Sequence, residues 1–122
     1  MRILISGLFA LFLISLPLTA IAKEGPMKLP AGSNESANMH NNAGIKHWGM
    51  GHAEEALKHF KEAAAADSSL AEVHFNEAVA LDALGDHGAA TKHFTKAKSL
   101  AQAKLESSKK ILKSPILNGH VK

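Results

Sequence analysis

The stretch GHAEEALKHFKEA at Gly51–Ala63 recurs 34 residues later as GDHGAATKHFTKA at Gly85–Ala97. The two copies share Gly, Ala, Lys, His, Phe and a final Ala in the same columns. In the first copy Ala56, Phe60 and Ala63 fall on one face of a helix, where small residues let a neighbouring helix approach and the phenylalanine fills the groove. A fixed period of this length is typical of helix-turn-helix repeat proteins. The sequence therefore predicts an all-α fold.

The first 22 residues read as a secretion signal. A positive start at Arg2 is followed by an apolar run and by the small-x-small site Ala20–Ala22. Cleavage there predicts a secreted or periplasmic protein that is not held at the membrane. An uncleaved anchor is the alternative, because residues 3–22 have the length that spans a bilayer. Residues 23–36, rich in Gly, Pro, Ser and Asn, are expected to form a flexible leader.

Five helices are expected after the leader, ending at glycine turns or at Ser114-Pro115. Ser69 and Glu72 have the spacing of a capping box, and Asp86 is placed to cap the fourth helix. The expected ranges are about 37–50, 52–66, 70–84, 87–103 and 105–113. We interpret the last helix as a polar lid on the end of the repeats.

Composition excludes several kinds of site. The chain has no cysteine, so it has no disulfide framework, thiolate metal site or haem attachment motif. Residues 35–86 hold 9 acidic residues and 3 lysines, whereas residues 87–122 hold 8 lysines and one glutamate. This asymmetry fits either an anionic partner for the C-terminal part or a solvated lysine-rich helix favoured by the helix dipole.

Two periods with these columns resemble the tetratricopeptide repeat family. The resemblance covers residues 37–104, as repeats 37–70 and 71–104, and leaves 105–122 as a capping helix and tail. His40 and His74 depart from the pattern, because the family often has Trp there. The resemblance implies a right-handed α-solenoid fragment that acts as a protein–protein interaction module.

The resemblance also implies a concave surface, lined by the first helix of each repeat, that binds a protein or peptide. Trp48 and Phe75 are its natural anchors, although both fit a purely structural role equally well. By column, the lining residues are Asn38, Asn41, Ile45, Trp48, Glu72, Phe75, Val79 and Asp82.

Eight histidines support an alternative function. An exported, histidine-rich helical chain is similar to the small periplasmic metal-binding bundles, which share its Gly-His and Lys-His steps. A helical metal site needs ligands on one face, and no two histidines here are four residues apart. Sites formed across the stack remain, pairing His59 with His93 and His40 with His74, for Cu, Ni or Zn.

Catalytic signatures are missing from the sequence: it has no nucleophile elbow, His-Glu-x-x-His motif or phosphate-binding glycine loop. We therefore expect no enzyme activity, and neither a cofactor nor a nucleic-acid partner. Repeat proteins need about three repeats for stability. With two repeats and a lid, this chain is expected to be marginally stable or to form a homo-oligomer.

Overall fold

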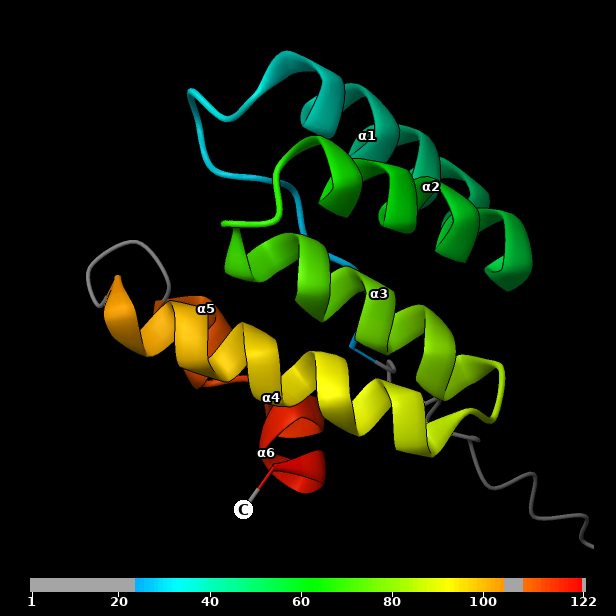
Figure 1. The fold of residues 1–122 in the computed structure, drawn as a ribbon. Coiled ribbons are helices and arrows are strands. Elements are labelled where there is room, and N and C mark those ends of the chain that lie inside the picture. Colours follow the sequence, from blue (N-terminus) through cyan, green and yellow to red (C-terminus); the bar gives the residue numbers. More distant parts are fainter. Residues whose placement is uncertain (1–23, 105–108, 122) are drawn as a thin grey trace, which may run out of the picture.

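The computed structural model describes residues 24–104 and 109–121, and every regular element within them is a helix (Figure 1). The all-α class is confirmed, and the first four helices lie close to their expected ranges. The six helices are α1 (Glu35–Gly49), α2 (Ala53–Ala66), α3 (Ala71–Ala83), α4 (His87–Ala103), α5 (Lys109–Leu112) and α6 (Pro115–His120).

Two helical hairpins form the body of the molecule. Helix α1 packs on α2 and α3 packs on α4, while contacts between α2 and α3 join the hairpins (Figure 1). Gly51 and Gly85, 34 residues apart, occupy the turn of each hairpin with φ of +79° and +86°. Only glycine adopts this left-handed conformation readily. The two hairpins thus turn at equivalent points of the sequence.

The repeated phenylalanines are core residues, as the period predicts. Phe60 and Phe94 are fully buried, and so are the repeated alanines on either side of them. The ring of Phe60 occupies the space beside Gly44, where an added Cβ would lie 2.5 Å from a ring carbon. Helix α3 is central, because every residue from Ala71 to Leu81 is buried.

The helix starts confirm one predicted cap and correct another. Asp86 caps α4, since its side chain accepts a hydrogen bond from the Ala89 amide. The capping box of Ser69 and Glu72 is wrong: α3 has no side-chain cap at its N-terminus. Both the amide and the hydroxyl of Ser69 donate to Asp67 instead, which forms a local turn just before the helix.

The segment before α1 is packed against the helices where a flexible leader was expected. Helix α1 begins at Glu35, two residues early, because the Asn34 side chain caps it. Residues 24–30, here named the strap, contact both hairpins. Met27 of the strap is buried in the core, with 6% of its surface exposed. In Figure 1 the strap passes behind α3 before the chain turns up toward α1.

The C-terminal part forms two short helices in place of one lid helix. Ser114 and Pro115 do not simply end a helix, because Ser114 caps α6 and Pro115 begins it. Ile111 of α5 and Leu117 of α6 are buried in the main core cluster. Both helices pack on α4, where the sequence predicts a cover for the second repeat. Residues 105–108 lie outside the described part.

In the described ranges, no helix has the length and apolar character needed to cross a bilayer. The predicted signal at residues 1–22 falls outside those ranges.

Candidate functional site

The eight residues expected to bind a partner lie on α1 and α3. Phe75 and Val79 belong to the core cluster that also contains Met27 of the strap and the apolar residues of α5 and α6. Partner binding at this surface stays a prediction. Of the eight, Asn41, Glu72, Phe75 and Val79 are buried, and Asn38, Ile45, Trp48 and Asp82 are half-buried.

Two buried asparagines hold the main chain of the strap. The Asn76 side chain accepts from the Met27 amide at 2.7 Å and donates to the Met27 carbonyl at 2.7 Å. The Asn41 side chain donates to the same carbonyl at 2.9 Å, and Asn76 also donates to Asn41. Because these hydrogen bonds are made to backbone atoms, the two asparagines fix the direction and position of the strap and do not depend on the identity of its side chain.

The histidines pair within each hairpin, and not with their equivalents in the other repeat. His40 of α1 stacks on His59 of α2, with ring centroids 6.1 Å apart. His74 of α3 stacks on His93 of α4 in the same way, at 6.0 Å. The four residues proposed from the sequence are therefore brought together in a different combination. Each hairpin therefore holds one of these histidine pairs, and in the first hairpin His47 also stacks on His59, with ring centroids 5.2 Å apart.

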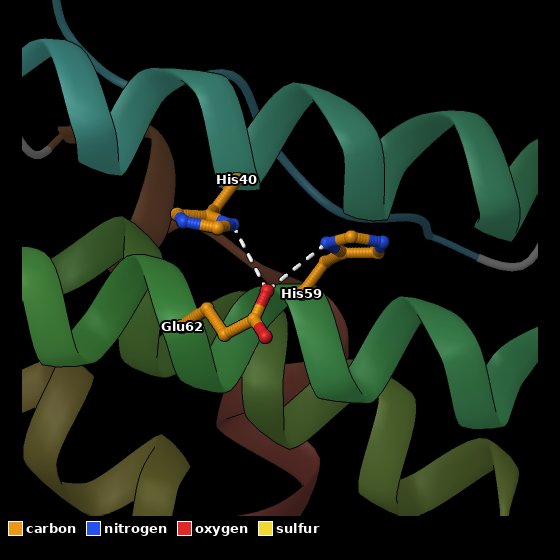
Figure 2. Close-up of side chains that lie close together, drawn as sticks. All are labelled: His40, His59 and Glu62. Carbon is orange, nitrogen blue, oxygen red and sulfur yellow. Dashed lines mark ion pairs between the residues drawn. The ribbon is translucent and has the colours of Figure 1, made fainter.

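Glu62 completes the first histidine site, made of His40, His59 and Glu62 (Figure 2). Its Oε2 lies 2.9 Å from Nδ1 of His40 and 3.2 Å from Nδ1 of His59. The three side chains are 27%, 28% and 40% exposed, so the site opens to solvent. Figure 2 shows both rings turned toward the carboxylate, one from each helix of the hairpin.

Glu77 completes the second histidine site, made of His74, Glu77 and His93. Nδ1 of His93 lies 3.4 Å from one Glu77 oxygen, and Nδ1 of His74 lies 3.9 Å from the other. Only 4% of the His74 side chain and 6% of the Glu77 side chain are exposed. The second site thus offers the donor set of the first in a far drier setting.

Hydrogen bonding fixes which nitrogen of His74 carries the proton. Its Nε2 lies 2.9 Å from the carbonyl oxygen of Ser68, and a carbonyl only accepts. Nε2 therefore donates, and the neutral ring presents the lone pair of Nδ1 to Glu77 and His93. A backbone carbonyl that orients an imidazole from behind is a common outer partner of a metal ligand.

Burial sets the charge of the second site. It lowers the pKa of His74 and of His93, so both rings favour the neutral form. It also raises the pKa of Glu77 from its ordinary value of 4.5 to about 7, against the attraction of Lys61 and Lys96. Near neutral pH the two imidazoles are therefore mostly uncharged, and the Glu77 carboxyl is protonated in about half of the molecules.

Several ring nitrogens in these sites are buried without a hydrogen bond. Among the described side chains this holds for Nδ1 of His59, His74 and His93, and of the neighbouring His47. The carboxylate oxygens near the first three lie within 4 Å, but not in hydrogen-bond geometry. Buried polar atoms normally have a hydrogen-bond partner, so a cluster of unpaired imidazole nitrogens requires an explanation.

The sequence reasoning missed both carboxylates, although a local signal for each was present. Glu62 follows His59 by three residues, and Glu77 follows His74 by three residues. That spacing puts two side chains on one face of a helix. Spacings between histidines alone do not reveal this pattern of a histidine followed by a glutamate three residues later.

No protein-family model matches this chain, and no curated protein matches it either.

Proposed function

We propose that this protein binds divalent transition-metal ions at the first and second histidine sites. The observation that carries this proposal is the convergence of two imidazoles and one carboxylate in each hairpin. In each group the ligand atoms lie within 4.8 Å of one another. Ions held at 2.0–2.2 Å from nitrogen and oxygen ligands need a modest contraction of such a group.

The donor set favours particular metals. Imidazole suits Zn, Cu and Ni, and the Irving–Williams order favours Cu(II) among divalent ions at a site of this kind. Three protein ligands leave one or more coordination positions for water or for an exchanging ligand. The half-exposed first site fits an ion that exchanges with solvent. These features support a binding or buffering role for the metal.

Protons compete with the metal at the second site. A metal ligand must be deprotonated, so metal binding displaces the proton that Glu77 holds below a pKa of about 7. The neutral rings of His74 and His93 present no such barrier near neutral pH. We therefore expect affinity at this site to fall as the pH decreases below 7, with release of up to one proton per ion from Glu77.

Calorimetric titration with Zn(II) and Cu(II), on the protein and on single variants, tests the proposal. His40→Ala and His93→Ala should each remove one ion from the stoichiometry. His52→Ala is the matched control, because this exposed histidine belongs to neither site and should leave the ion count unchanged. Equal binding by all four proteins contradicts the proposal.

A second function, peptide binding by tetratricopeptide-like repeats in an exported protein, has one specific observation in its favour. Asn41 and Asn76 form hydrogen bonds with the backbone of Met27. A peptide that displaces the strap could form the same hydrogen bonds with its own backbone. Fluorescence anisotropy of a labelled strap peptide, EGPMKLP, tests this on protein that begins at Ala31. Binding that Asn76→Ala abolishes supports the function, and the absence of binding contradicts it.

A further inference from the structure

A third group of histidines and a carboxylate lies where α6 meets the α3–α4 hairpin. Nδ1 of His87 lies 2.6 Å from Oδ1 of Asp82, and Nε2 of His120 lies 3.0 Å from the same oxygen. The two imidazole rings stack with centroids 6.3 Å apart. We propose that Asp82, His87 and His120 form a third site for a divalent transition-metal ion, named the C-terminal site.

Thr91 determines which nitrogen of His120 carries a proton. Its hydroxyl donates to the carbonyl of His87 at 2.8 Å, so it can only accept from Nδ1 of His120, 3.2 Å away. The neutral His120 ring then turns the lone pair of Nε2 toward the carboxylate of Asp82. The Nε2 lone pair and the carboxylate oxygen, 3.0 Å apart, are two donor atoms that one metal ion can bind together.

The surroundings hold two of the three ligands in place and leave the third adjustable. Phe94 stacks on His120 at 4.9 Å and fixes its ring plane. The Asp82 and His120 side chains are 11% and 20% exposed, whereas His87 is 70% exposed. His87 can therefore rotate so that its nitrogen and that of His120 face one ion. Both imidazoles are already within contact distance of the carboxylate.

The ligand class follows from the donor set, which is two imidazoles and one carboxylate as in the two histidine sites. The inference of a Zn, Cu or Ni ion therefore rests on the proposed function. The location differs, because no ligand of the C-terminal site belongs to a repeated histidine pair. An ion there joins the short helix α6 to both helices of the second hairpin, and so fastens the C-terminal end of the chain.

Native mass spectrometry with Zn(II) alone tests the site on the full protein. We expect three bound ions for the wild type, and two for His87→Ala and for His120→Gln. His87→Ala is the informative variant, because so exposed a side chain contributes little to folding. His52→Ala should again keep all ions. Hydrogen exchange of the α6 amides should slow about 100-fold at Zn(II) concentrations 100 times the Kd, but not in His87→Ala.

The outcomes separate this site from the other two. Two ions in the wild type, with no loss in His87→Ala or His120→Gln, overturn the C-terminal site. One ion that is lost in His87→Ala, but kept in His40→Ala and His93→Ala, supports the C-terminal site and overturns the two repeat-related sites. No bound ion overturns both proposals.

Discussion

The two hairpins carry the same histidine pair, 34 residues apart, but surround it differently. In the first hairpin the carboxylate comes from the second helix, as Glu62 of α2. In the second hairpin it comes from the first helix, as Glu77 of α3. The positions one period away from these glutamates hold Lys96 and Ala43, so the carboxylates are not part of the repeat.

Burial is the main consequence of this difference. Helix α3 lies in the middle of the stack, so Glu77 is 6% exposed, whereas Glu62 is 40% exposed. A buried carboxyl resists ionisation, and burial raises the pKa of Glu77 to about 7. The second site is therefore coupled to protons through Glu77, whereas the first site differs from it in being open to solvent.

The largest expected effect tests whether the hairpins have equivalent cores. Phe60→Ala and Phe94→Ala should each cost about 3–5 kcal/mol of unfolding free energy, because both rings are fully buried. Phe94→Ala should cost more, since its ring also packs on Phe75 and His120. Urea denaturation without metal measures both, with exposed Lys58→Ala as the control. A larger loss for Phe60→Ala contradicts this ranking of the two cores.

Most of the helical architecture follows from the sequence, because period and turn glycines are local signals. The ranges of α1 to α4 and the burial of Phe60 and Phe94 were predicted from them. Of the two histidine sites, the four histidines were named from the sequence, but their pairing and the two glutamates were not. The partner of each histidine depends on how α1 packs on α2, and the strap contacts join Met27 to Asn76, 49 residues away. Local patterns contain no information about such distant contacts.

The second prediction concerns the pH dependence of stability that the burial of Glu77 produces. The folded-state pKa of Glu77, about 7, is above its ordinary value of 4.5, so the folded protein binds more protons than the unfolded chain between these values. This term lowers the unfolding free energy as the pH rises through that window. In metal-free protein, Glu77→Gln should therefore be more stable than the wild type by about 3 kcal/mol at pH 8.

Below pH 4.5 the stabilities of wild type and Glu77→Gln should converge, because the carboxyl is then neutral in both folded and unfolded protein. His74 and His93 add an opposite slope below pH 6.5, since their lowered pKa makes the unfolded state bind more protons there. That slope is common to both proteins and cancels in the difference. Thermal unfolding from pH 4 to pH 8 measures the difference, and a constant offset would contradict the assignment.

A third, smaller effect compares the closest helix contacts of the two hairpins. Gly44 stands where the second hairpin has Ala78. In the first hairpin a Cβ at this position would meet the Phe60 ring at 2.5 Å. Gly44→Ala should cost a net of about 1 kcal/mol, because overpacking of about 1–3 kcal/mol exceeds the gain in helix propensity. Gly49→Ala is the control, since a Cβ there meets nothing within 4 Å. A stabilised Gly44→Ala protein contradicts the packing argument.

The smallest stability effect is expected for Glu62→Gln, the counterpart of the Glu77 variant. Glu62 is 40% exposed, and substitutions at such positions change unfolding free energy by about 0.5 kcal/mol or less. Metal-free Glu62→Gln should therefore unfold like the wild type. With Zn(II) at 100 times its Kd for the first site, the wild type should gain about 2.7 kcal/mol from that ion, and Glu62→Gln should lose most of this gain. A variant that keeps the full gain would show that the two imidazoles alone hold the ion. The difference between the two glutamates would then lie in burial and not in metal binding.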